Sequence, residues 1–204
     1  MRWVFLHAFL VLAACGSGRA PVPQPRPQVD IRQCLADLGR SGVRYRALPD
    51  RYQGGGCQTV GTVQLLDIGV PVTNLTAITC PMAQGLADWT RTVRQLARER
   101  LGGELLRIES FGSYACRPVN NQIGGRLSEH ARANAADISA FVLADGRRIT
   151  VERGWNGPDG AVRAFLRLAH RAGCRRFSIG LSPDSDRFHY NHMHFDMGRG
   201  PYCR

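Results

Sequence analysis

The apolar residues of this chain fall into periodic runs that predict helices and strands in alternation. A repeat close to 3.6 residues, typical of amphipathic helices, occurs over residues 30–40, 81–101 and 160–172. Runs of strand length lie at 43–48, 104–110, 137–142, 147–151, 176–181 and 192–197. Asp145-Gly146 separates two of these runs and favours an antiparallel hairpin. The pattern predicts an α+β fold with a small antiparallel sheet backed by two or three helices.

Two side chains in the predicted helices could belong either to the core or to a site. Trp89 shares the apolar stripe of segment 81–101, so we expect it in the core and not at a ligand site. His170 falls off the apolar stripe of segment 160–172, which predicts a solvated side chain. The glycine- and threonine-rich residues 49–79 are expected to form a loop with small strands.

The beginning of the chain has the composition of a leader. Residues 3–14 form an apolar run of signal-peptide length, too short for a stable bilayer anchor. The run ends in Leu-Ala-Ala-Cys, which resembles the bacterial lipobox and implies that residues 1–14 are a lipoprotein signal peptide and that Cys15 is lipidated. The alternative is a plain signal peptide with an incidental cysteine.

The stretch that follows the leader is rich in proline. Prolines at every second position from 21 to 27 favour an extended polyproline II tether over residues 15–29. The remaining residues, 30–204, are expected to form one domain. The lipobox implies a periplasmic protein anchored to a membrane by lipid, and the absence of aspartate after Cys15 favours the outer membrane.

All basic residues of the chain are arginine. There are 27 of them, and the formal net charge is +11. This charge favours an anionic partner such as a lipid headgroup, a cell-wall polymer or a nucleic acid, although a compositional bias that replaced lysine explains it equally well. Because the arginines are spread along the chain and no nucleic-acid-binding motif accompanies them, we do not expect nucleic-acid binding.

Six cysteines remain after Cys15 is set aside, and an even number in an exported chain indicates disulfides. The sequence does not decide their pairing. The preferred pairs are Cys34 with Cys57, Cys80 with Cys116, and Cys174 with Cys203. A cysteine zinc site is not expected, because the chain has no Cys-x-x-Cys sequence.

Four of the six histidines lie in two short pieces of the chain. His130 precedes Asp137 by seven residues in the first piece, and the second contains His189, His192 and His194. On a strand, a separation of two residues places both imidazoles of His192 and His194 on one face. Ligand types that bind zinc, with one histidine to spare, could then converge and leave an open coordination position, as catalytic zinc requires. The alternative is a chance scatter of unrelated histidines.

The same two pieces resemble a known family. The sequence SEHARANAAD, residues 128–137, resembles the Ser-x-His-x-x-Gly-x-Ala-x-Asp signature of the peptidoglycan-cleaving LAS metallopeptidases. The sequence HYNHMH resembles their His-x-His motif in its murein endopeptidase form, and residues 34–204 are similar to bacterial extensin-like C-terminal domains. Ala133 stands where the signature has glycine; at a positive φ, alanine costs on the order of 1 kcal/mol.

The resemblance implies the fold of hedgehog and D-alanyl-D-alanine peptidases and a monomeric zinc enzyme that acts on peptidoglycan stem peptides. Either an endopeptidase acting on cross-links or a D,D-carboxypeptidase fits; the alternative is a non-catalytic cell-wall-binding module, which Ala133 favours. The implied zinc ligands are His130, Asp137 and His194. The implied general base is His192, and the implied second catalytic group is His189.

Four further residues have expected roles near this site. Ser128 matches the signature serine and is expected to orient substrate or a ligand. Arg117 is expected to contact substrate or the developing oxyanion, and a plain surface arginine is the alternative. Glu129 and Asp196 are candidates to hold a histidine tautomer, and ordinary surface carboxylates are the alternative for both.

Overall fold

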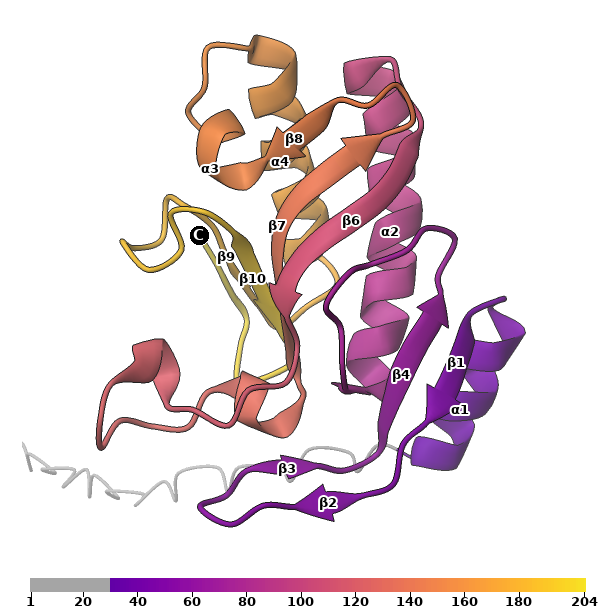
Figure 1. The fold of residues 1–204 in the computed structure, drawn as a ribbon, viewed down its shortest axis with the longest axis vertical. Coiled ribbons are helices and arrows are strands. Elements are labelled where there is room, and N and C mark those ends of the chain that lie inside the picture. The colour runs from indigo at the N-terminus through magenta and orange to yellow at the C-terminus, as the bar shows by residue number, and fades with distance from the viewer. Residues whose placement is uncertain (1–29) are drawn as a thin grey trace, which may run out of the picture.

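The structure is a computed structural model that describes residues 30–204 (Figure 1). The predicted signal peptide, the predicted lipidation of Cys15 and the predicted tether therefore lie outside the described residues. The fold is α+β, as the sequence predicts. Its helices are α1 (Ile31–Arg40), α2 (Cys80–Leu101), α3 (Val151–Gly154) and α4 (Gly160–Cys174), with 3₁₀ turns η1 (Val119–Asn121) and η2 (Glu129–Arg132).

The strands form one larger sheet and two smaller ones. The larger sheet has the order β11-β9-β10-β7-β6, and β8 also pairs with β7. Its strands are β6 (Leu105–Gly112), β7 (Ala135–Leu143), β8 (Arg148–Thr150), β9 (Ile179–Leu181), β10 (Met193–Asp196) and β11 (Tyr202–Cys203). The three-stranded sheet consists of β1 (Arg44–Ala47), β4 (Thr62–Asp67) and β5 (Ile78–Thr79), and β2 (Arg51–Tyr52) pairs with β3 (Gln58–Thr59).

Local signals set the ends of the long helices. The carboxylate of Asp30 accepts hydrogen bonds from two backbone amides in the first turn of α1, and Asp159 does the same for α4. Gly102 adopts the left-handed conformation that ends α2. The predicted hairpin is confirmed, since β7 and β8 pair antiparallel around the Asp145-Gly146 turn. The predicted run 192–197 forms β10, and the short β11, which the pattern does not predict, follows it.

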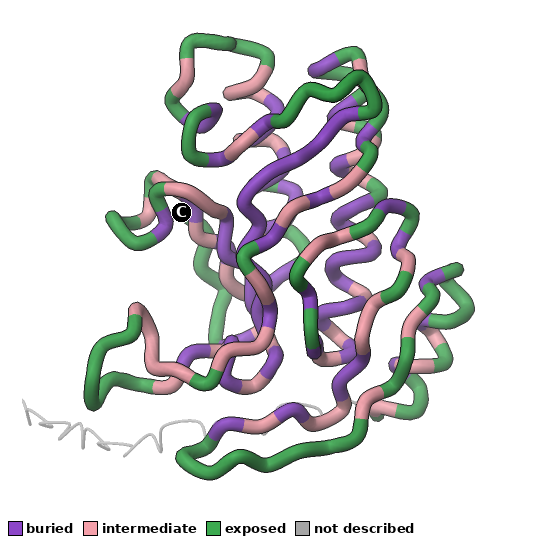
Figure 2. Tube along the Cα trace, in the orientation of Figure 1, coloured by how far each residue is buried: buried purple, intermediate pink, exposed green. Residues whose placement is uncertain are grey.

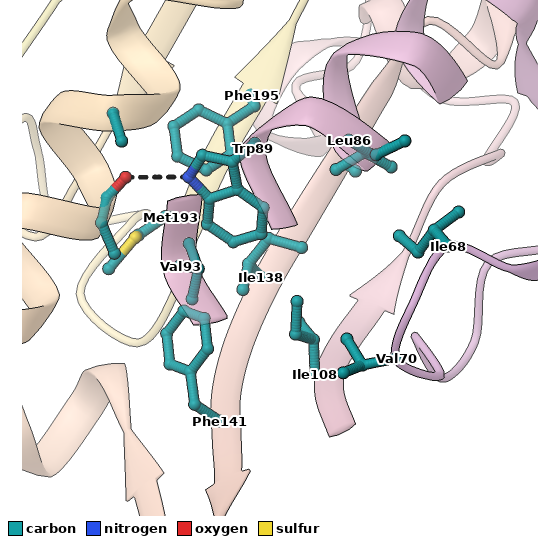
Figure 3. Packing of buried hydrophobic residues seen from close by; sticks show 14 of the residues in the cluster. Ile68, Val70, Leu86, Trp89, Val93, Ile108, Ile138, Phe141, Met193 and Phe195 are labelled. Carbon is teal, nitrogen blue, oxygen red and sulfur yellow. Dashed lines mark hydrogen bonds between the residues drawn. The ribbon is translucent and has the colours of Figure 1, made fainter. Parts of the chain in front are cut away.

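The core lies between the larger sheet and the helices α2 and α4 (Figures 1 and 3). Trp89 is fully buried, as predicted, and its indole N–H donates a hydrogen bond to the Ala169 carbonyl at 2.9 Å. Its ring packs against Phe141 and Phe195. Strand β7 is buried along its whole length, as the continuous purple trace in Figure 2 shows. The strand that carries Asp137 is therefore the centre of the fold.

The prediction that His170 is solvated is wrong. The side chain is only 5% exposed, stacks on the ring of Phe195, and meets the ring of Trp155 edge to face. Burial lowers the pKa of this imidazole. The helical pattern missed this contact because it reports only one packed side of α4. A second side of α4 packs against α3, and Trp155, which directly follows α3, contacts His170 there.

The disulfide prediction is correct for Cys174–Cys203 and wrong for the other two pairs. The bonds are Cys34–Cys80, Cys57–Cys116 and Cys174–Cys203. Helix α1 packs against α2 and brings Cys34 to the start of that helix. Cys57 precedes β3, which packs against η2, and this contact places it near Cys116. Both predicted pairs assumed neighbours along the chain, whereas packing between distant elements sets the actual partners.

Candidate metal centre

The two histidine-bearing pieces meet on adjacent strands of the larger sheet. Strands β7 and β10 pair antiparallel with His194 directly opposite Asp137. Residues in register on neighbouring strands point to the same face, so the two side chains meet although they are 57 residues apart in the chain. His130 comes from η2, the 3₁₀ turn just before β7. The structure thus brings together all three residues predicted to bind a metal.

Three side chains form a compact triangle through four donor atoms, since both oxygens of Asp137 take part. His194 Nδ1 lies 2.8 Å from Asp137 Oδ1, His130 Nε2 lies 3.1 Å from Asp137 Oδ2, and the two ring nitrogens lie 3.2 Å apart. Tetrahedral zinc with ordinary bond lengths places its ligand atoms roughly 3.3–3.6 Å from one another. If these atoms moved slightly apart, their spacing would therefore equal that of the ligand atoms around tetrahedral zinc.

Outer hydrogen bonds determine which nitrogen of each ring faces this triangle. His130 Nδ1 donates to the Ser113 carbonyl at 2.6 Å, and His194 Nε2 donates to Asp196 Oδ2 at 2.8 Å. In a neutral imidazole, a proton held by an outer acceptor leaves the other nitrogen as a lone-pair donor. Two lone pairs and a carboxylate then face one another in a buried space. Such a set is stable only with a cation among its members.

The charges of the site favour positive charge at its centre. Burial alone would raise the pKa of Asp137, but hydrogen bonds from His130 and His194 more than offset it and hold this pKa well below its usual range. Burial alone would lower the pKa of His194, yet the Asp137 and Asp196 carboxylates raise it to about 9. Without a metal ion, a proton at His194 satisfies the carboxylates; a divalent cation would satisfy the same electrostatics.

Zinc binding is expected to release about one proton per chain at pH 7. His194 is protonated there in the metal-free protein, because its pKa is about 9, and zinc has to displace the proton from Nδ1. Affinity should therefore rise with pH up to about 9. Calorimetric titration with zinc in two buffers of different ionisation enthalpy measures the released protons. Identical heats in both buffers would contradict this protonation state.

His192 lies beside the triangle, with one ring nitrogen close to the Asp137 carboxylate. Its Nε2 is 3.5 Å from Asp137 Oδ1, while its Nδ1 donates to the Asn191 side-chain oxygen at 2.9 Å. Burial lowers the pKa of His192 to about 4, so the ring is neutral at pH 7. His192 precedes β10 by one residue and does not lie on the strand, but its ring still reaches the carboxylate as the spacing of two predicts.

His189 approaches the same centre from the preceding loop. Its ring centroid lies 5.1 Å from that of His192 and 5.8 Å from that of His194. Its Nδ1 donates to Asp186 Oδ1 at 2.8 Å, which directs Nε2 away from this carboxylate. Asp186 was not identified from the sequence. Its position three residues before a motif histidine is the available signal, because that separation allows the side chains to meet across a turn.

The remaining predicted residues take different positions. Ser128 caps η2 by accepting a hydrogen bond from the His130 backbone amide, so it holds a predicted ligand in place. Arg117 lies 3.9 Å from Asp137 Oδ2, which places its guanidinium at the edge of the centre. Asp196 holds the His194 tautomer as proposed, whereas Glu129 accepts a hydrogen bond from the Asn134 side chain and is not bonded to a histidine.

Ala133, which stands where the LAS signature has glycine, adopts a positive φ. Its φ is 52°, and its backbone groups bond to the His130 carbonyl and the Thr79 amide. The left-handed conformation costs alanine on the order of 1 kcal/mol. Its fully buried methyl group contributes about 0.8 kcal/mol in return. The two effects nearly cancel, so the turn between His130 and Asp137 keeps its shape without glycine.

The family model for the C-terminus of extensin-like proteins matches residues 32–204. This chain belongs to the extensin-like C-terminal family. The match covers the whole candidate metal centre and all six disulfide cysteines. No curated protein and no solved structure matches the chain.

The extensin-like domain has a pocket directly over this centre. Its volume is about 440 Å³, which lies within the range of small-ligand sites. The walls come from residues 117–130, from the loop at 186–192 and from residues 198–202. Figure 1 shows the first two of these segments projecting on the same side of the larger sheet. All predicted site residues of the domain line this pocket, so a ligand in it would contact the metal ligands and the additional histidines together.

Proposed function

We propose that this extensin-like domain is a zinc peptidase that hydrolyses amide bonds in peptidoglycan stem peptides. An endopeptidase acting on cross-links is preferred to a D,D-carboxypeptidase. The observation that carries the proposal is the convergence of His130, Asp137 and His194 beside a neutral, partly buried His192 in an open pocket. The resemblance to LAS metallopeptidases, with their hedgehog-type fold, supports the substrate class.

The chain's own residues suit such a reaction. Zinc held by His130, Asp137 and His194 would supply Lewis acidity and make a water nucleophilic near neutral pH. His192 Nε2 accepts the proton of the attacking water, since its Nδ1 is engaged by Asn191. Asp186 accepts a hydrogen bond from His189 Nδ1 and so orients this ring beside His192, where His189 is proposed to contact the developing oxyanion.

The proposed location is the periplasm, with the domain anchored through Cys15 to the outer membrane and acting as a monomer. Among residues 30–204, none of the helices is long and apolar enough to cross a bilayer. The full chain has a formal charge of +11, and its basic residues would attract the protein to an anionic polymer such as the cell wall.

The test is digestion of purified dimeric muropeptides with the zinc-loaded protein. Monomers are expected to appear with zinc, to stop appearing after a chelator is added, and to reappear when zinc is restored. Dimers that persist while the protein holds one zinc per chain would overturn the hydrolase. The alternative, a non-catalytic cell-wall-binding module, predicts sedimentation with intact peptidoglycan without any turnover.

Ala133 is the specific observation that favours the non-catalytic alternative, because it stands where the LAS metallopeptidase signature has glycine. The left-handed turn at this position weakens that argument, since the ligands on both sides of the turn converge. A binding module also has no need of a neutral histidine next to the metal ligands. We therefore prefer the enzyme.

A further inference from the structure

The pocket contains cations that have no partner in the described part of the protein. Four carboxylates line it, and each is engaged by a nearby side chain: Glu129 by Asn134, Asp137 by His130 and His194, Asp186 by His189, and Asp196 by His194. The guanidinium groups of Arg126 and Arg199 line the same pocket without a hydrogen bond or ion pair to any residue from 30 to 204. The groups left for recognition are therefore positively charged.

Arg199 and Tyr202 lie on the same wall of the pocket, and Tyr202 belongs to β11, which is separated by β9 from the strand β10 that carries His194. Asp196 and Tyr202 both lie in register with Ile179, on the two sides of β9, so the three side chains point to one face. Two strand spacings separate Asp196 from Tyr202, which is roughly 10 Å. All three residues line the pocket, and Arg199 lies in the connection between β10 and β11.

This wall of the pocket is held firmly although its surface is open. Cys203 is bonded to Cys174 of α4, and the Tyr202 amide donates to the Ser178 carbonyl at 2.9 Å. The Ser182 and Ser185 hydroxyls both donate to the Arg204 carbonyl. Tyr202 nevertheless remains 49% exposed. A fixed backbone that presents a half-exposed aromatic ring is suited to contact with a ligand, because little entropy is lost when the ligand binds.

We propose that Arg199 and Tyr202 form a subsite for a free carboxylate of an extended peptide substrate, about three residues from the cleaved amide. The separation follows from the two strand spacings, roughly 10 Å, between β11 and the His194-bearing strand β10, at about 3.3 Å per extended residue. Arg199 supplies the forked donors that match a carboxylate, and the Tyr202 ring packs against the aliphatic part of the same residue. The inference rests on the proposed function, because it assumes that a peptide is cleaved at the metal centre.

The experiment uses two synthetic peptides on the zinc-loaded protein. They differ only in the third residue from the cleaved bond, which carries a carboxylate in one and the corresponding carboxamide in the other. The native domain is expected to prefer the acid by on the order of tenfold in KM. Arg199→Gln should remove this preference while leaving kcat within about twofold. Arg100→Gln, an exposed arginine at the end of α2 outside the pocket, is the matched control and should leave the preference intact.

Three outcomes would overturn the subsite. The native domain could treat acid and amide alike, Arg199→Gln could weaken both peptides equally, or Arg126→Gln, in the wall formed by residues 117–130, could remove the preference instead. If the zinc-loaded domain cleaves neither peptide, the proposed function fails. Equilibrium binding of the two peptides then decides the subsite by itself, since the same tenfold preference and the same loss in Arg199→Gln are expected for binding.

Discussion

Replacing Asp137 with asparagine is expected to abolish both zinc retention and hydrolysis. The carboxylate contacts both ring nitrogens of the triangle, and asparagine keeps its size while removing its charge. Zinc affinity should fall by more than the roughly 10–100-fold that loss of an outer hydrogen-bond partner costs. Zinc content after dialysis and muropeptide hydrolysis measure the two effects on the same sample.

Asp145→Asn provides the matched control for this substitution. Asp145 lies at the other end of the β7–β8 hairpin, where its exposed carboxylate bonds to Arg147. This variant should keep zinc and activity, because the turn is remote from the pocket. If Asp137→Asn retains one zinc per chain with native affinity, the metal is held elsewhere and the proposed centre is wrong.

The His192→Gln variant is expected to lower kcat by about 10²–10⁴-fold, which is the usual contribution of a general base. Zinc content should stay at one per chain, since His192 is not among the three converging ligands. Glutamine can still bond to Asn191, so the local fold should be preserved. Zinc analysis and steady-state kinetics on the same preparation separate loss of the base from loss of the metal.

A fall in kcat of less than tenfold would place the base elsewhere, and His189 is then the next candidate because its ring lies 5.1 Å from that of His192. Loss of zinc in His192→Gln would instead make His192 a ligand. The two results differ in metal content, so neither can be mistaken for the other.

The sequence predicted the principal elements correctly because their signals are local. The apolar stripe containing Trp89 predicted α2, and the Asp145-Gly146 dipeptide predicted the β7–β8 hairpin. The same reasoning selected His130, Asp137 and His194, since their residue types and order resemble a family signature. These inferences require only chemistry and spacing along the chain.

The errors concern contacts between distant segments. The preferred pair Cys34–Cys57 is wrong, because the packing of α1 on α2 and of β3 on η2 gives both residues other partners. The prediction that His170 is solvated failed because a helical pattern reports only one face of the helix. Trp155 covers His170 on another face. Asp186 was overlooked because a loop carboxylate acquires significance only through the histidine it meets.

The sequence by itself determined which chemical groups this domain carries and the order in which they occur. Amphipathic periodicity, helix caps and motifs each depend on only a few neighbouring residues. The tertiary structure alone decided which nitrogen of His130 and of His194 faces Asp137. That choice depends on the Ser113 carbonyl and the Asp196 carboxylate, and only the folding of the chain around β7 brings them to the two rings.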